Sequence, residues 1–234
     1  QVYAMQFRIA LTERLSIIAV KDGWIDMNPT LSAFDSSGFA NVTAGAKYNL
    51  IRDPKNQTIV SAGATFEIPM GQGRVLQGEG DGDFNIFLTG GKQLGCDWHA
   101  LSSIGLRVPA NHTDGSQMAW ISSHLDRRLT DNFYGFVESN WFHYVRGGAG
   151  DLFGGAATGF EGHDVFNLGA AGVTNGAFDG QDVVTFAFGG KYKFGDYNEF
   201  GVAYEIPLTE NLNAAGGRDR VIESRLTADL ILRY

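Results

Sequence analysis

Apolar residues alternate with small or polar residues along most of this chain. From Val42 to Leu50 every second residue is apolar, and the residues between them are small or polar. The same period of two recurs in residues 65–68, 184–194 and 199–206. A period of two places successive side chains on opposite faces of a β-strand. The chain is therefore predicted to consist of strands with one apolar and one polar face.

The alternation divides the chain into about eleven predicted strands, and no helical period of useful length lies between them. The side-chain phase is ambiguous in 15–27, 83–94 and 117–129. The predicted strands are residues 2–11, 15–27, 39–51, 58–68, 83–94, 98–108, 117–129, 133–145, 182–194, 199–207 and 222–234. This pattern predicts an all-β fold.

The connections between these strands alternate between short and long. The short ones are 12–14, 52–57, 95–97, 130–132 and 195–198. The long ones, rich in Gly, Asp and Ser, are 28–38, 69–82, 109–116, 146–181 and 208–221. In an antiparallel up-and-down sheet this order places all short turns at one end and all long loops at the other. Bacterial outer-membrane barrels have this asymmetry.

Composition and charge exclude several other classes of protein. With 44% apolar residues and 19% charged residues, the chain has enough apolar surface to fold. The 32 glycines argue against a helical protein, and the net charge of −8 argues against nucleic-acid binding. Cys96 stands alone, which excludes an intramolecular disulfide and a cysteine zinc cluster. No run of 18 apolar residues occurs, although a membrane-spanning β-strand needs none because only alternate residues face lipid.

The C-terminal residues carry the most specific pattern in the chain. Leu226, Ala228, Leu230 and Leu232 lead at alternating positions to the terminal aromatic Tyr234. This pattern resembles the C-terminal strand of bacterial outer-membrane β-barrels, in which it is the assembly signal. Together with the loop asymmetry, the resemblance extends to the whole chain and indicates a porin-like barrel of this broad class.

The resemblance implies one transmembrane barrel domain over residues 1–234, with a long external loop at about 146–181. It also implies a place in the outer membrane of a Gram-negative cell. The expected partners are the lipid bilayer, lipopolysaccharide and the barrel-assembly machinery, which would bind the C-terminal strand. No cofactor and no nucleic acid are expected.

The strand count leads to a separate expectation. With the directions assigned above, the first and last of eleven strands are parallel, so an antiparallel barrel cannot close between them. We therefore expect about twelve strands, with an upward strand preceding Gln1 that the chain lacks. The alternative is a strand hidden in 146–181, for instance around Val165–Val173.

The polar faces of the strands are expected to face the lumen. They carry charges of both signs, which can line an aqueous path or pair with one another and close it. A slight excess of cations on the walls hints at anionic solutes. The candidate pore-lining residues are Arg8, Lys47, Glu67, Arg107, Arg128, Glu138, Lys191, Lys193, Glu205, Arg225, Asp229 and Arg233.

Aromatic residues collect near the predicted strand ends. In outer-membrane barrels such residues form girdles at the membrane interfaces, because one side of an indole or phenol is apolar while the other can be wet. A β-sandwich core is the alternative and does not explain placement at strand ends. The candidate interface aromatics are Trp24, Trp98, Trp120, Trp141 and Tyr234.

Two motifs suggest other chemistry. Glu79, Asp81 and Asp83 are weak candidates for a metal site, but they lack the spacing of a known calcium motif, and a flexible acidic loop is favoured. Ser123, His124 and Asp126 contain the residue types of a hydrolase triad. Neighbours on one strand point to opposite faces, so Ser123 and His124 are not expected to meet.

The sequence thus favours a non-enzymatic outer-membrane channel for passive diffusion of small polar or anionic solutes. A closed barrel that anchors or binds a surface partner remains open as the alternative. An outer-membrane lipid hydrolase and a soluble β-sandwich are less favoured.

Overall fold

The structure, a computed structural model, describes residues 1–28, 35–75, 77–78, 80–112, 115–146, 180–195, 197–212, 218–219 and 224–233. Its elements are β1 (Val2–Ala10), β2 (Leu15–Met27), β3 (Ser36–Phe39), β4 (Val42–Asp53), β5 (Thr58–Ile68), the 3-10 turn η2 (Gly73–Val75), β6 (Asp83–Leu94), β7 (Trp98–Pro109), β8 (Gln117–Arg128), β9 (Phe133–Arg146), β10 (Asp182–Phe194), β11 (Asn198–Pro207), β12 (Asn211–Leu212), β13 (Arg218–Asp219) and β14 (Arg225–Ile231). Among the described residues, no helix is long and apolar enough to cross a bilayer.

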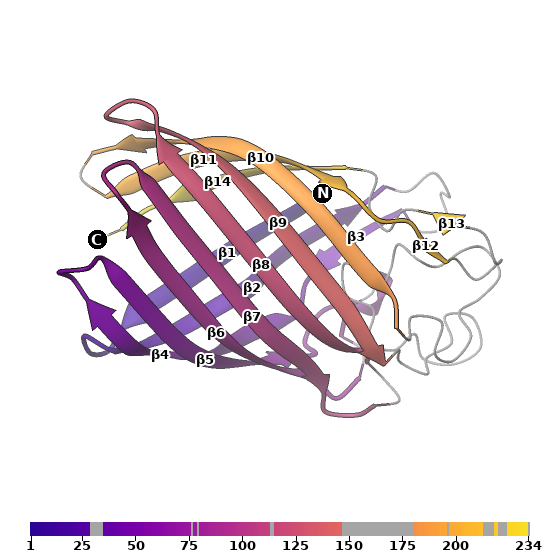
Figure 1. Cartoon of the computed structure of the whole chain (residues 1–234). Helices are drawn as coiled ribbons and strands as arrows, with labels where there is room; N and C mark the ends of the chain where they lie inside the picture. The colour runs from indigo at the N-terminus through magenta and orange to yellow at the C-terminus, as the bar shows by residue number, and fades with distance from the viewer. Residues whose placement is uncertain are drawn as a thin grey trace.

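The strands form one curved sheet in which chain order and spatial order agree. The path is β1-β2-β4-β5-β6-β7-β8-β9-β10-β11-β14, and each neighbouring pair is antiparallel. Figure 1 shows these strands tilted and rolled around a common axis. The short strand β3 extends the pairing of β2, and β12 pairs with β13 apart from the main sheet. The predicted all-β, up-and-down barrel architecture is confirmed.

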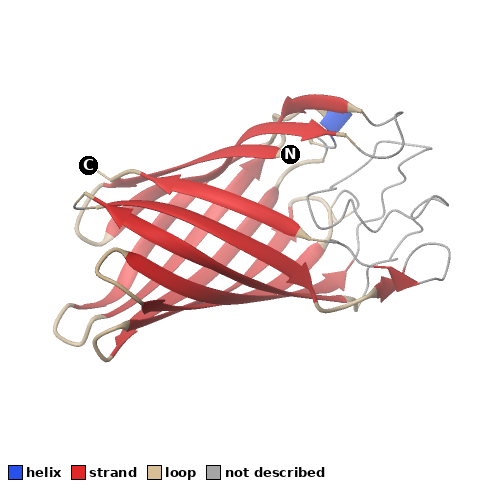
Figure 2. Cartoon of the chain, turned by 90° about the horizontal axis from the view of Figure 1, so that it is seen from above, coloured by secondary structure: helices blue, strands red, loops and turns tan. Residues whose placement is uncertain are grey.

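The short turns lie together at one end of the barrel. Figure 2 shows them side by side at the end where the C-terminus lies, with η2 toward the opposite end. Two of these turns are closed in the same way: Thr12 Oγ1 accepts a hydrogen bond from the Leu15 amide at 2.9 Å, and Thr130 Oγ1 accepts one from the Phe133 amide at 3.1 Å. Gly95 closes another turn with a φ of 70°, a value that glycine adopts readily.

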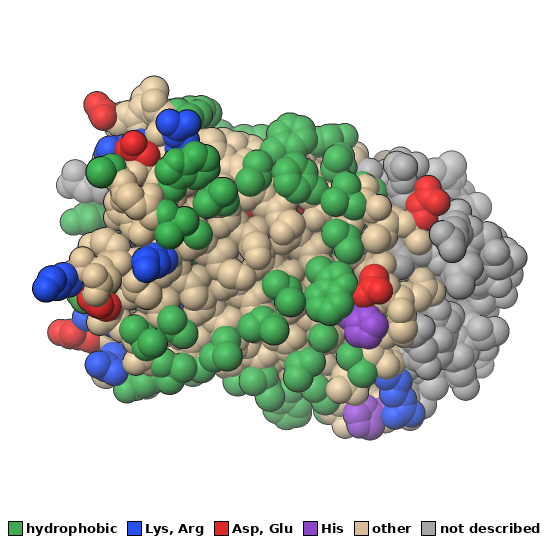
Figure 3. All heavy atoms as spheres, in the orientation of Figure 1, with side chains coloured by type: hydrophobic (Ala, Val, Ile, Leu, Met, Phe, Trp, Pro, Cys, Tyr) green, Lys and Arg blue, Asp and Glu red, His purple; other side chains and the backbone are tan. Residues whose placement is uncertain are grey.

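Most of the large apolar side chains of the sheet face outward. Ile86, Ile104 and Phe188 are 58%, 52% and 49% exposed, whereas Asp126 and Thr185 on the inner face are 2% and 0% exposed. Figure 3 shows hydrophobic side chains over the middle of the visible surface and charged side chains toward its two ends. An apolar outer band between polar rims is the arrangement expected of a barrel that spans a lipid bilayer.

A register shift explains why the phase of residues 15–27 is ambiguous in the sequence. Met5 pairs with Asp22 and Phe7 with Ala19, so two steps along β1 correspond to three along β2. Ala19 and Trp24, which pair with Phe7 and Tyr3 on one face of β1, therefore lie on the same face although their numbers differ in parity. The predicted strand 39–51 is interrupted at residues 40–41 and belongs to β3 and β4, which keep one register against β2. A register shift lies between Asn49 and Ile51 opposite β5.

The two edge strands of the sheet run in the same direction, because the path contains an odd number of antiparallel strands. Within the described residues, β1 and β14 do not pair with one another, and the side chains of both strands are exposed throughout. The expected twelfth strand stays a prediction. The alternative strand around 165–173, most of the 146–181 loop and Tyr234 lie outside the described residues.

Candidate functional site in the barrel lumen

A charged network centred on Asp126 crosses the inner wall from β7 to β10. Asp126 lies directly opposite His99 in the β7–β8 ladder, and His99 Nδ1 is 2.7 Å from Asp126 Oδ1. Lys191 Nζ donates to Asp126 Oδ2 at 2.6 Å, and His124 Nε2 is 3.3 Å from the same oxygen. His124 Nδ1 reaches Glu138 Oε1 at 2.6 Å. Because Asp126 is only 2% exposed, this wall holds a carboxylate that is buried and fully paired.

Lys193 has different surroundings from Lys191. Its Nζ lies 4.2 Å from the centroid of the Tyr134 ring, within the range of a cation–π interaction. Glu199 is directly opposite Lys193 in the β10–β11 ladder, but Glu199 pairs with Arg233 at 2.7 Å. No carboxylate pairs with Lys193 in the described part of the chain, so its charge is available to the lumen.

Ion pairs also occupy the inner wall between β11 and β14. Arg225 pairs with Glu205, which is 4% exposed, and Thr185 Oγ1 donates to Glu205 at 2.5 Å. Arg233 pairs with Glu199, which is 8% exposed. The structure therefore pairs the predicted pore-lining residues Arg225 and Glu205 with one another, and pairs the predicted Arg233 with Glu199, which the sequence did not single out. Asp229, on β14, forms no ion pair with any described residue.

Glu67 does not form part of an open wall, in contrast to the sequence-based expectation. It is 6% exposed and accepts hydrogen bonds from Asn41 Nδ2 at 2.6 Å and from Thr43 Oγ1 at 3.3 Å. The Asn41 side-chain oxygen in turn accepts hydrogen bonds from the amides of Gly71 and Gly78. The Glu67 carboxylate thus fixes the Asn41 side chain, and Asn41 in turn holds the segment after β5 through Gly71 and Gly78.

Arg8 and Lys47 are the free cations of the opposite wall. The register Arg8↔Ile18↔Gly45 places Arg8 on the same face as Lys47, and the two charges are close enough to repel one another. Neither side chain has a carboxylate partner among the described residues. Two cations without counter-charges make this wall electropositive, in contrast to the neutralised wall around Asp126.

The two other predicted pore-lining cations lie near the ends of the barrel. Arg107, toward the loop end of β7, donates from Nε to the Ser116 carbonyl oxygen at 3.4 Å. Arg128 donates from Nε and a terminal nitrogen to Asp97 Oδ1 at 3.0 and 2.8 Å. Because Asp97 belongs to a short turn, Arg128 helps to hold the turn end of the barrel together.

A cavity of about 510 Å³ opens at the turn end of the lumen. Its walls come from both sides of the barrel, since Arg52 of β4 and Glu199 of β11 both contribute. The Asp126 network opens into it, and it also has apolar walls. The residues that line it include Ile59, Gly91, His99, Leu101, Asp126, Lys191 and Lys193.

Three of the predicted interface aromatics lie on the outer face near strand ends. Trp24 packs edge-on against Phe39, with ring centroids 4.8 Å apart. Trp98 is 40% exposed and lies under the Arg127 guanidinium, at 5.3 Å. Trp141 donates from Nε1 to Asp182 at 2.8 Å. Their contact with a membrane interface stays a prediction.

Trp120 differs from the expectation, because it faces the lumen. Its Nε1 donates to Asn85 at 3.1 Å, and its ring lies over Gly105, which leaves the space that the indole occupies. Trp120 also packs with Phe142 against the buried cluster of Met118, Tyr144 and Val183. Apolar residues therefore occupy both faces of β8 near its loop end, which explains why the phase of 117–129 is ambiguous in the sequence.

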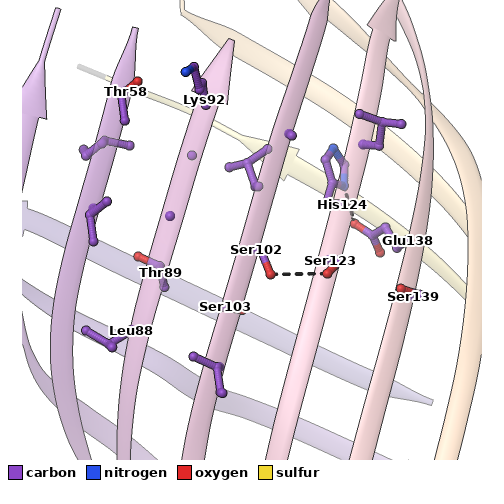
Figure 4. A pocket seen from close by; sticks show the side chains of 18 of the residues that line it. Thr58, Leu88, Thr89, Lys92, Ser102, Ser103, Ser123, His124, Glu138 and Ser139 are labelled. Carbon is purple, nitrogen blue, oxygen red and sulfur yellow. Dashed lines mark hydrogen bonds and ion pairs between the residues drawn. The ribbon is translucent and has the colours of Figure 1, made fainter. Parts of the chain in front are cut away.

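The residue types of a hydrolase triad do not converge. Ser123 Oγ lies 3.2 Å from Ser102 Oγ on the outer face, whereas His124 points to Glu138 on the inner face (Figure 4). Ser102 and Ser123 line a shallow outer groove of about 660 Å³. Ser123 and His124 project from opposite faces of β8, so this strand does not present the serine to the imidazole.

The structure brings no metal site together among the residues that it describes. Asp81 and Asp83 lie on the described part of the 69–83 segment, whereas Glu79 lies outside it. Sequence reasoning missed the central role of Asp126 and of both histidines. The available signal was the spacing His124-x-Asp126, which puts both side chains on one face of a strand.

No protein-family model and no curated protein matches this chain. Two solved structures resemble it over almost its whole length. The NanC porin, 7% identical, aligns with a TM-score of 0.51 over 96% of this chain and 94% of its own. An outer-membrane channel from Pseudomonas putida F1, 13% identical, aligns with a TM-score of 0.57 over 96% of this chain and 79% of that channel. The likeness shows that the chain has the fold of outer-membrane, porin-like β-barrels.

Proposed function

We propose that this barrel is a bacterial outer-membrane channel through which small polar solutes diffuse down their gradients, with a preference for anions. The channel role is supported by the fold shared with the NanC porin and the Pseudomonas putida channel. The mechanism is exclusion by diameter, with the charges of the wall raising or lowering the barrier for each ion sign.

The anion preference rests on the uneven pairing of charges along the inner wall. Asp126 and Glu205, buried acids of β8 and β11, have cationic partners in Lys191 and Arg225, so these pairs contribute little net field. Arg8, Lys47 and Lys193 face the lumen without carboxylate partners in the described part of the chain, and they outnumber the unpaired acid Asp229. A lumen with an excess of unpaired charges of one sign concentrates the oppositely charged solute, and this is the observation that carries the proposal.

The apolar outer face supports insertion in a bilayer, which is the remaining requirement of a channel. Large side chains such as Ile86 and Leu106 are about half exposed there and would be covered by lipid chains. Contact with lipopolysaccharide on the outer leaflet, and recognition of β14 by the barrel-assembly machinery, belong to the same proposal.

Planar-bilayer recording tests the channel directly. The folded chain, added to a planar membrane, should give discrete conductance steps above background, and a heat-denatured sample should give none. Folded protein that inserts without any steps would instead support a closed barrel that anchors or binds a surface partner.

A further inference from the structure

We propose that the turn-end cavity is a binding site for small carboxylates with a flat apolar body, with Lys193 as the anion-binding residue. This inference rests on the proposed channel for its biological purpose, since the site lies on the solute path. The binding itself can be measured without conductance.

Neighbouring ion pairs determine which lysine at the cationic end of the site is left without a carboxylate partner. Lys191 is neutralised by Asp126 at 2.6 Å, and Glu199 is taken by Arg233 at 2.7 Å. Lys193 is therefore left without a carboxylate partner among the described residues, and its Nζ lies 4.2 Å from the centroid of the Tyr134 ring. An ammonium held against a ring, with no carboxylate partner among the described residues, is a ready partner for a carboxylate from solution.

The apolar end of the site is a slot on the adjoining wall. In the ladders of β5, β6 and β7, Ile59 and Leu101 both lie opposite Gly91, and all three side-chain positions face inward. A methyl group on Gly91 would lie 3.3 Å from Ile59 and 3.7 Å from Leu101, so glycine leaves a slot between two aliphatic side chains. Ile59 and Leu101 are 40% and 47% exposed although they face the lumen. Exposed apolar surface inside an otherwise polar lumen favours a ligand that covers it.

The cationic and apolar parts line one cavity of about 510 Å³. A ligand that satisfies both has one carboxylate for Lys193 and a flat apolar group for the slot. A simple inorganic anion gains only the first contact, and a neutral alcohol of the same shape gains only the second. The site therefore distinguishes an organic carboxylate from both.

The test measures binding of 4-fluorobenzoate to the folded full chain by fluorine NMR, with 4-fluorobenzyl alcohol and fluoroacetate as probes of the separate contacts. We expect 4-fluorobenzoate to bind more tightly than either comparison probe. Lys193→Gln should weaken its binding about tenfold or more, because a charged hydrogen bond is lost. Arg127→Gln is the matched control, since Arg127 is an exposed cation on the outer face of β8 near the same end, and it should leave binding unchanged.

Gly91→Ala provides a second test that keeps every charge. The added methyl group narrows the slot, so 4-fluorobenzoate should bind several-fold more weakly while fluoroacetate is unaffected. Wild-type affinity in both Lys193→Gln and Gly91→Ala would overturn the site, as would equal binding of the alcohol and the carboxylate. Binding as predicted by a chain that gives no conductance steps would contradict the channel and leave the site standing.

Discussion

Replacing Asp126 by Asn tests whether the inner-wall network holds the barrel together. Asp126 is 2% exposed and has short contacts with Lys191 and His99, at 2.6 and 2.7 Å, and a longer one with His124, at 3.3 Å. Hydrogen bonds to charged groups contribute about 1.5–3 kcal/mol each. Breaking a buried ion pair by removing one partner costs about 3–5 kcal/mol, because the remaining charge keeps its desolvation penalty. We therefore expect Asp126→Asn to lower the free energy of unfolding by about 3–5 kcal/mol.

Reversible urea unfolding in lipid vesicles, followed by tryptophan fluorescence, measures this change. Asp97→Asn is the matched control, because Asp97 pairs with Arg128 at the exposed turn end, and screening by water should keep its effect much smaller. The double variant Asp126→Asn/Lys191→Met should recover a large part of the loss, because it removes the uncompensated ammonium. An Asp126→Asn variant as stable as Asp97→Asn would refute the reasoning.

Three further predictions concern packing, orientation and closure. Gly105→Ala should lower the free energy of unfolding by about 1–3 kcal/mol in the same assay, because the added methyl group would lie 2.5 Å from the Trp120 ring. Gly90→Ala is the control and should be as stable as wild type, because no atom lies nearer than 4.0 Å to the added methyl group. In single-tryptophan variants, lipid-borne quenchers should quench Trp98 strongly and Trp120 weakly, and the reverse order would contradict the assigned faces. In a Cys96→Ser background, cysteine pairs placed on β1 and β14 should form no disulfide, because these two edge strands do not pair with one another among the described residues; rapid oxidation would show direct pairing.

Strand positions could be predicted from the sequence because the bilayer and the lumen impose opposite polarities on the two faces of each strand. The ends of β5, β6 and β10 agree with the predicted ranges for this reason. The facing of the side chains was hardest to predict where the alternation fails, as in β2 at the register shift opposite Met5 and Phe7. A bulge changes the facing of later residues without any change in composition, so periodicity alone does not locate it.

The candidate site was harder to predict because the sequence shows which charges face inward but not which of them pair. Lys191 and Lys193 are equivalent in a pattern of alternation, yet only Lys191 reaches Asp126. Tryptophan is a residue type typical of membrane interfaces, so the sequence places Trp120 there. The glycine that accommodates the Trp120 ring in the lumen, Gly105, lies on the neighbouring strand β7. Both distinctions depend on cross-strand register, which arises only when the sheet is assembled.

The reversal potential under a salt gradient is the most direct test of an anion-preferring channel. Wild-type protein in a planar bilayer should give conductance steps whose reversal potential lies on the anion side of zero. Arg8→Gln/Lys47→Gln should move the reversal potential toward the cation side, while Arg127→Gln, on the outer face, leaves it unchanged. Cation preference in the wild type, or a reversal potential that ignores the loss of both lumen cations, would contradict the account.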